Sequence, residues 1–142
     1  MGDAVNMLIC QHTLDEIYKS LGSVDNESGG LIGSKSNEGI LDSFYFDKGR
    51  RSSANEYVPN VDDLRQQLSY WDKEQIKFRG IIHSHTISDI LSPKDIKMAR
   101  KILDMNMLSS VLMPIYLIKE QKILWYVVSN DCVKCVDFKI VN

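Results

Sequence analysis

Residues 76–95 read IKFRGIIHSHTISDILSPKD, and this stretch decides the fold because it predicts a strand, a loop and a helix start in succession. The segment from Ile76 to His83 has the apolar centre Gly80-Ile81-Ile82, which is typical of a buried strand. Ser92 followed by Pro93 predicts a helix start, because serine suits the N-cap and proline suits the first helical position. A buried strand is therefore expected to lead into a helix that covers the sheet.

The residues before this stretch predict a helix and two strands. Thr13 and Glu16 form a capping-box signature, which predicts a helix that ends at Gly22. Residues 27–33, ESGGLIG, are too rich in glycine for a helix and predict a strand whose glycines let another backbone come close. Residues 40–46 are rich in β-forming side chains and predict the next strand.

Two further helices are predicted from apolar residues at helical spacing, after a polar segment from Asp47 to Glu56 that predicts an exposed loop. The first of these helices begins after Asn60, and its inner face carries Val61, Leu64, Leu68 and Trp71. The second begins at Ser92, and its inner face carries Ile96, Ala99, Leu103 and Met107.

The C-terminal third predicts three strands, over residues 110–118, 122–129 and 133–141. The turns between them are short enough for hairpins, so this part of the sheet should be antiparallel, while helices separate the earlier strands. The expected class is α/β, with a mixed sheet. No repeat or break in composition divides the chain, which predicts a single domain over residues 1–142.

Composition narrows the functional classes. The 142 residues carry a formal net charge of -2 with interspersed signs, so no basic stripe is present that would bind nucleic acid. No secretory signal is visible at the N-terminus, and no apolar run reaches the roughly 18 residues of a membrane helix. Three cysteines, an odd number, fit a reducing compartment. We therefore expect a cytoplasmic protein that does not bind a membrane.

The triplet His83-Ser84-His85 carries the strongest chemical signal. In an extended chain residues i and i+2 point to the same face, so both imidazoles can bind one metal ion while Ser84 points away. Asp95 follows in the first turn of the predicted helix and supplies a carboxylate. Three protein ligands leave the fourth position of a tetrahedral zinc ion open for water, which is typical of catalytic zinc sites.

Two more residues are candidates for the chemistry. Glu27 stands at the start of the glycine-rich strand and is the candidate base that accepts a proton from the zinc-bound water. Ser92 is a candidate hydroxyl donor to the oxyanion of a tetrahedral intermediate. Asp89 is an alternative ligand in case Asp95 does not reach the metal.

These residues together resemble the JAMM/MPN metalloprotease family, whose pattern is a glutamate, then H-[ST]-H, a gap of seven residues, and S-x-x-D. The matching segments are Glu27 with Ser28-Gly29-Gly30, then His83-Ser84-His85, then Ser92-Pro93-Lys94-Asp95, and the order of predicted elements follows the family over nearly the whole chain. The resemblance implies an MPN fold, similar to that of cytidine deaminases, with a curved mixed sheet flanked by about three helices.

The resemblance also implies an activity. His83, His85 and Asp95 would bind one Zn²⁺ per chain, Glu27 would be the general acid/base, and Ser92 would stabilise the oxyanion. The substrate would be a ubiquitin-like protein or its conjugate, cleaved at an amide bond of the C-terminal tail, in deconjugation or tail processing. A partner subunit or a homodimer is also compatible with the family.

Two features depart from the family pattern. Only six residues separate His85 from Ser92, and Thr86 stands where the family usually has proline. The long insertions with which eukaryotic members grip ubiquitin are not evident, so substrate contacts would come from residues 47–56 or from a partner. A catalytically inactive MPN scaffold and a metallohydrolase acting on a small peptide amide are therefore the alternative functions.

Cys132 and Cys135 form a C-x-x-C pair that has no second copy in the sequence. Half of a structural zinc site and a redox pair are possible interpretations, but a redox pair should precede a helix, and none is predicted here. Two ordinary strand cysteines are the favoured interpretation.

Overall fold

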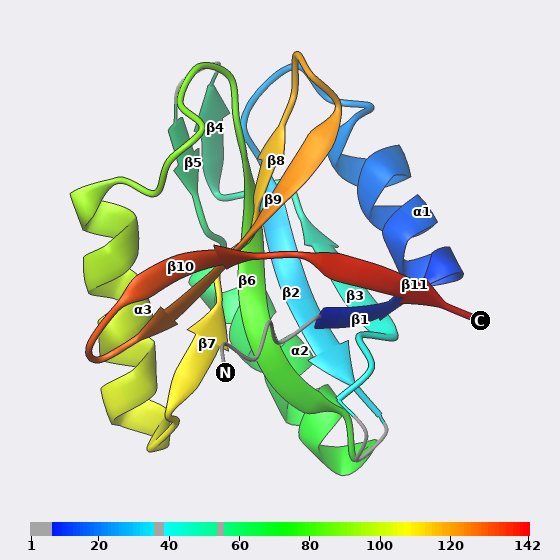
Figure 1. Cartoon of the computed structure of the whole chain (residues 1–142), viewed down its shortest axis with the longest axis vertical. Helices are drawn as coiled ribbons and strands as arrows, with labels where there is room; N and C mark the ends of the chain where they lie inside the picture. Colours follow the sequence, from blue (N-terminus) through cyan, green and yellow to red (C-terminus); the bar gives the residue numbers. More distant parts are fainter. Residues whose placement is uncertain (1–6, 36–38, 54–55) are drawn as a thin grey trace.

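The chain folds into a mixed sheet with helices on both faces, as the computed structural model in Figure 1 shows. The structure describes residues 7–35, 39–53 and 56–142. In chain order the elements are β1 (Met7–Cys10), α1 (Gln11–Leu21), β2 (Gly29–Ser34), β3 (Ser43–Asp47), β4 (Arg51–Ser53), β5 (Glu56–Val58), α2 (Val61–Lys73), β6 (Lys77–His85), α3 (Pro93–Asn106), β7 (Ser110–Leu112), β8 (Ile115–Leu117), β9 (Lys122–Ser129), β10 (Val133–Val136) and β11 (Phe138–Val141).

The main sheet has the strand order β10-β9-β7-β6-β2-β3, and β8 pairs with both β6 and β9. At its centre β6 runs antiparallel to β2 and parallel to β7 and β8. The parallel pairs arise because α3 connects β6 to the strands that follow, whereas β9 and β10 form an antiparallel hairpin. The predicted α/β class with a mixed sheet is confirmed.

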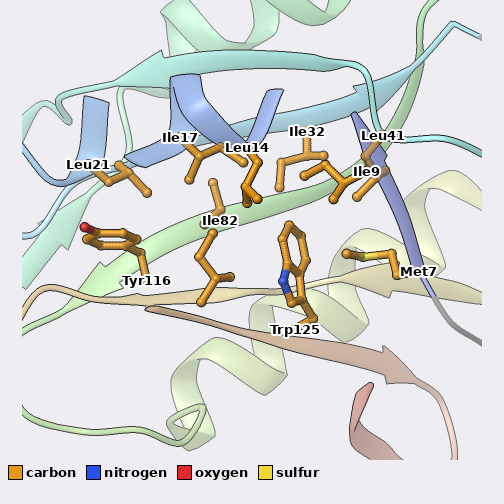
Figure 2. Packing of buried hydrophobic residues seen from close by; sticks show 11 residues of the cluster. Met7, Ile9, Leu14, Ile17, Leu21, Ile32, Leu41, Ile82, Tyr116 and Trp125 are labelled. Atoms are coloured by element: carbon orange, nitrogen blue, oxygen red, sulfur yellow. The ribbon is translucent and has the colours of Figure 1, made fainter. Parts of the chain in front are cut away.

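Alternating side chains on the central strands build a core on each face of the sheet. Ile32 of β2 and Ile82 of β6 pack under α1, in the cluster that Figure 2 shows with Leu14 and Trp125. On the opposite face, Leu31 packs against the α2 residues Leu64 and Trp71. A third cluster joins α3 to β7, β8 and β9. The face of β6 that carries Ile81 therefore lies towards α2 and α3.

The first helix differs from its prediction at its N-terminus. It begins at Gln11, not at Thr13, so the predicted capping box is wrong. Thr13 lies inside the first turn and is 1% exposed, because the chain enters α1 directly from β1 and turns this side chain inward. The helix does end before Gly22, where a Cβ atom would lie 2.5 Å from the Tyr18 carbonyl oxygen. Glycine is required there by this close contact, since its φ of -79° suits any residue.

The prediction of a loop over residues 47–56 is also wrong, although Lys48, Arg50 and Glu56 are exposed as expected. Asp47 ends β3 and is 4% exposed, and the segment after it forms the hairpin of β4 and β5. Residues 54 and 55, which fall in the predicted loop, lie outside the described part of the chain.

The other two helices follow their predictions closely. Asn60 is the N-cap of α2 and Ser92 is the N-cap of α3, with Pro93 at the start of the helix. Two predicted inner-face residues are exposed. Val61 is 51% exposed at the first position of α2, and Met107 is 93% exposed because it leaves α3 as a left-handed C-cap with a φ of 53°. Among the described residues, no helix combines the length and apolar character needed to cross a membrane.

Two of the C-terminal strand predictions merge elements that are separate in the structure. The run over residues 110–118 is divided into β7 and β8 around Pro114, which lacks the amide hydrogen that a continuous ladder needs. The run over residues 133–141 is divided at Asp137, where the chain leaves the main sheet. Beyond it, β11 pairs in parallel with β1 and joins the two ends of the described chain.

Candidate metal centre

Two imidazoles project side by side from the end of β6. His83 and His85 share the strand face of Ile81, and they are 6% and 9% exposed. The strand extends through His85, two residues beyond its predicted end, so regular strand geometry orients both rings. The Nε2 atoms of the two rings lie 2.8 Å apart.

Ser84 points to the other face and fixes the neighbouring strand. Its Oγ accepts a hydrogen bond of 2.9 Å from the Ser28 amide, and its own amide donates to the Ser28 carbonyl oxygen over 2.8 Å. Gly29 then pairs with His83 in the antiparallel register of β2 and β6, where a Cβ atom would lie 2.5 Å from the Ile82 carbonyl oxygen. The glycine therefore permits the close approach that the sequence predicted, and it brings the segment with Glu27 beside the histidines.

Asp95 reaches the two imidazoles from the first turn of α3. Its amide donates to the Ser92 Oγ over 3.1 Å, and the Ser92 amide donates to the Asp95 Oδ2 over 3.0 Å, which completes a capping box. The same Oδ2 lies 3.3 Å from the Nε2 of His83 and 3.7 Å from the Nε2 of His85. The loop of six residues is therefore long enough to bring Asp95 to the histidines.

The alternative ligand Asp89 is not part of this group. Its side chain is exposed, and its carbonyl oxygen accepts a hydrogen bond of 2.8 Å from the Tyr126 hydroxyl. Within the described residues, His83, His85 and Asp95 form the cluster of ligand-type side chains that can hold a metal ion.

The spacing of the three atoms fits a tetrahedral zinc ion. Zinc bonds of about 2.0–2.1 Å in a tetrahedron place neighbouring ligand atoms about 3.3 Å apart. The three separations here are 2.8, 3.3 and 3.7 Å, which scatter around that value. Two imidazole nitrogens so close to each other repel unless a proton or a metal ion lies between them. The donor set of two imidazoles and one carboxylate therefore fits Zn²⁺.

A backbone contact orients the ring of His85 for metal binding. Its Nδ1 lies 2.9 Å from the Ser88 carbonyl oxygen, which can only accept, so the Nδ1 carries the hydrogen and the Nε2 offers its lone pair to the cluster. The Nδ1 of His83 is buried and has no hydrogen-bond partner in the described part of the chain. The tautomer of His85 is thus fixed by the loop that follows β6.

The electrostatics of the group favour an ionised carboxylate. Burial alone would raise the pKa of Asp95, but hydrogen bonds with His83 and His85 and with the Ser92 amide hold it well below its usual range. Burial alone would lower the pKa of His85, but hydrogen bonds from its protonated form to Asp95 and to the Ser88 carbonyl raise it above its usual value. Asp95 is therefore ready to bind a cation at neutral pH.

Glu27 and Ser92 both line a cleft that opens onto the two histidines. The cleft has a volume of about 610 Å³. One Glu27 carboxylate oxygen accepts a hydrogen bond of 3.1 Å from the Thr86 amide, directly after His85. The cleft is lined by Glu27, Glu56, Tyr57, Val58, Pro59, Ile81, His83, His85, Thr86, Ile87, Ser88, Ser92, Lys94, Asp95 and Met98. The structure thus brings all five predicted site residues to one cleft.

Several residues of the cleft are not among the sequence candidates. Ser88 and Thr86 act through backbone atoms, for which side-chain identity gives no signal. Tyr57 contributes to the cleft from β5, and it lies between the predicted loop over residues 47–56 and the predicted helix after Asn60, where the sequence predicted no element. Tyr57 and Val58 are both β-forming residues, and this pair is the signal that could have predicted a strand beside the cleft.

Cys132 and Cys135 lie away from the candidate metal centre. Both are exposed and carry free thiols. Cys135 lies in β10, as the interpretation of ordinary strand cysteines expects, whereas Cys132 lies in the turn before that strand, where its amide donates to the Ser129 Oγ over 3.2 Å. Neither belongs to the cluster of His83, His85 and Asp95.

Comparison with known proteins finds similarity in structure only. The sequence matches no protein family profile and no curated protein. A solution structure from Desulfitobacterium hafniense matches with a TM-score of 0.73 at 17% identity, over 95% of this chain and 92% of that one. A solution structure from Salinibacter ruber matches with a TM-score of 0.62 at 16% identity, over 96% of this chain and 92% of that one.

A third similar structure belongs to a protein of a known domain type. The crystal structure of a JAB1/MPN domain protein from Archaeoglobus fulgidus matches with a TM-score of 0.56 at 16% identity, over 96% of this chain and 99% of that one. At such identities the similarity shows the fold alone. The chain therefore has an MPN-like fold, as the sequence resemblance implied.

Proposed function

We propose that this chain with its MPN-like fold is a zinc-dependent amide hydrolase of the JAMM metalloprotease type, acting as a single domain. The observation that carries the proposal is the convergence of His83, His85 and the Asp95 carboxylate within 3.7 Å of one another, in a cleft that Glu27 also lines. A carboxylate next to a metal site with three protein ligands is the arrangement that hydrolytic zinc enzymes use.

A bound zinc ion would supply a Lewis acid and a coordinated water with a pKa of about 7. The chain's own residues prepare the site for this ion. The Ser88 carbonyl sets the tautomer of His85, and the capping box of Ser92 fixes the direction of Asp95. Both ligands are thus oriented by backbone geometry before any substrate enters, which lowers the cost of assembling the site.

Glu27 is proposed as the group that accepts a proton and then passes it to the leaving amine. The Thr86 amide holds one of its carboxylate oxygens, so the other oxygen is left for the proton. Ser92 is proposed as the oxyanion donor. Its Oγ accepts the Asp95 amide, which leaves the hydroxyl hydrogen to donate to the charge that develops on the substrate carbonyl oxygen.

The proposed substrate is the C-terminal tail of a ubiquitin-like protein or of its conjugate, in the cytoplasm. The family resemblance of the five site residues supports this choice, and the cleft adds an open volume of about 610 Å³ whose lining includes Val58, Pro59 and Ile87. An extended tail can enter a cleft of this volume more readily than a folded protein surface can. A short peptide amide and a non-catalytic scaffold are the alternatives that the next experiment separates.

The test combines zinc analysis with two matched glutamate variants. Glu27→Gln and Glu56→Gln alter two glutamates that line the same cleft, and only the first is assigned a role in proton transfer. The probes are ubiquitin with a C-terminal aminocoumarin amide and a short peptide aminocoumarin amide. Purified wild type should contain close to one zinc per chain and release the fluorophore. Glu27→Gln should retain zinc and lose about 10²–10⁴-fold in turnover, whereas Glu56→Gln should also retain zinc and lose much less, because it removes no group assigned to proton transfer.

The outcomes separate the hypotheses. Less than about 0.1 zinc per chain with no release from either probe would favour the scaffold. Strong preference for the short peptide over the ubiquitin probe would favour a small-amide hydrolase. Full turnover by Glu27→Gln would show that the assigned proton transfer is wrong.

A further inference from the structure

The hairpin of β4 and β5 stands beside the candidate metal centre without belonging to the main sheet. Its two strands pair only with each other among the described elements, and Figure 1 shows them next to β6. Glu56, Tyr57 and Val58 of β5 line the cleft. A two-stranded hairpin is marginal by itself, so additional contacts must hold this one in position.

A single buried carboxylate supplies these contacts. The Tyr57 hydroxyl donates to the Asp47 Oδ2 over 2.5 Å, and the Asn60 amide donates to the same oxygen over 3.1 Å. The other oxygen of Asp47 accepts from the Gly49 amide over 2.9 Å. Asp47 therefore binds Gly49 before the hairpin, Tyr57 within it and Asn60 after it. At 4% exposure, this carboxylate is protected from competing water.

The ring of Tyr57 lies against the strands that carry the site. A Cβ atom at Gly29 would lie 2.8 Å from the Cε2 of Tyr57, so the ring packs directly on the backbone of β2. Gly29 is the residue that pairs with His83, and Glu27 lies two residues before it. The hydroxyl of Tyr57 therefore reaches Asp47 while its ring covers the point where β2 meets the histidine strand.

We propose that the hydrogen bond between Tyr57 and Asp47 is a latch that fixes the hairpin as one wall of the cleft, which makes Tyr57 a positioning residue for substrate binding. The role in substrate binding rests on the proposed function, whereas the latch itself does not. Burial and the hydrogen bond to Asp47 raise the pKa of Tyr57 far above its usual value, so the donor hydrogen is retained across the physiological range.

The chain offers a matched control for this bond. The Tyr45 hydroxyl donates to the Asp63 Oδ2 over 2.6 Å, which is the same kind of charge-assisted hydrogen bond. This second bond links β3 to α2, and neither of its residues lines the cleft. Tyr57→Phe and Tyr45→Phe each remove one hydroxyl and keep the ring. A purely structural role would affect both variants in the same way.

Hydrogen–deuterium exchange tests the latch whether or not the protein turns over a probe. In Tyr57→Phe, the amides of Arg50 and of β5 should exchange about 10-fold faster than in wild type, because the hairpin opens more often. In Tyr45→Phe they should exchange at the wild-type rate. Asp47→Asn weakens the same bond from the acceptor side and should also speed exchange in the hairpin. Hairpin exchange that is unchanged in Tyr57→Phe, or equally faster in Tyr45→Phe, would overturn the proposal.

Kinetics on the peptide aminocoumarin amide extend the test to substrate binding. Tyr57→Phe should raise KM about 10-fold with a smaller change in kcat and with unchanged zinc content, because the wall moves while the ligands stay in place. Tyr45→Phe should keep the wild-type KM. Equal KM values in the two variants would refute the positioning role. Failure of the proposed function has a different signature, since wild type would then lack zinc or turnover while the exchange comparison still stands.

Discussion

The two walls of the cleft are built in different ways. On one wall, strand alternation sets the directions of His83 and His85, and a capping box sets the direction of Asp95. On the other wall, the hairpin is held by Tyr57 and Asp47, which are ten residues apart and come from different strands. The candidate metal ligands are thus positioned by short-range backbone rules. The hairpin wall depends on one buried carboxylate.

Loss of a ligand should have the largest effect on the first wall. His85→Ala removes one of three ligands, so zinc affinity should fall by more than the roughly 100-fold that loss of an outer contact to a ligand costs. His12→Ala is the control, since this exposed histidine contacts the Asp42 carbonyl oxygen from α1. Competition titration against a chromogenic chelator measures both affinities. Similar zinc affinity in the two variants would remove His85 from the ligand set.

Removal of a helix N-cap tests whether the capping box of α3 also contributes to zinc affinity. Ser92→Ala and Asn60→Ala remove the N-cap side chains of α3 and α2, and each should lower the free energy of unfolding by about 1 kcal/mol. Only Ser92→Ala should also weaken zinc binding, by about 10-fold, because its capping box orients Asp95. Urea denaturation of the zinc-free proteins and zinc titration provide the two measurements.

Asn60→Ala is the control, because it removes an N-cap that does not orient a candidate ligand. If Asn60→Ala weakens zinc binding as much as Ser92→Ala does, general destabilisation explains both effects. The comparison between the two walls would then lose its basis, since capping would not set the ligand geometry.

The smallest effect is expected far from both walls, at the end of α3. Met107 has a φ of 53° and is 93% exposed, so its side chain gains little from burial while its backbone is in the left-handed region. Met107→Gly should raise the free energy of unfolding by about 0.5–1 kcal/mol, as glycine adopts this conformation without strain. Zinc affinity should not change. A loss of stability in urea denaturation would show that the Met107 side chain makes contacts that outweigh the strain.

The sequence predicted the features that depend on neighbouring residues. The start of α3 was correct because Ser92 and Pro93 act within one turn, and the shared face of the two histidines follows from strand geometry alone. The wrong start of α1 has the opposite cause. Thr13 matches a capping pattern, but the chain continues from β1, whose partner β11 comes from the other end of the described chain.

The hairpin wall also depends on contacts that a local sequence pattern does not reveal. Asp47 and Tyr57 carry no local pattern that announces their hydrogen bond, because a carboxylate buried by tertiary packing looks like any polar loop residue in sequence. Pro114 and Asp137 similarly mark breaks between strands that apolar runs conceal. Contacts made by tertiary packing therefore decided what the sequence could not predict, including the part of the cleft that β5 lines.

The most direct test of the central claim is the anomalous diffraction of crystals grown with zinc, collected at the zinc absorption edge. The account predicts one peak per chain, about 2.0–2.2 Å from the Nε2 atoms of His83 and His85 and from a carboxylate oxygen of Asp95. A peak at Cys132 and Cys135 with none between the two histidines would contradict it.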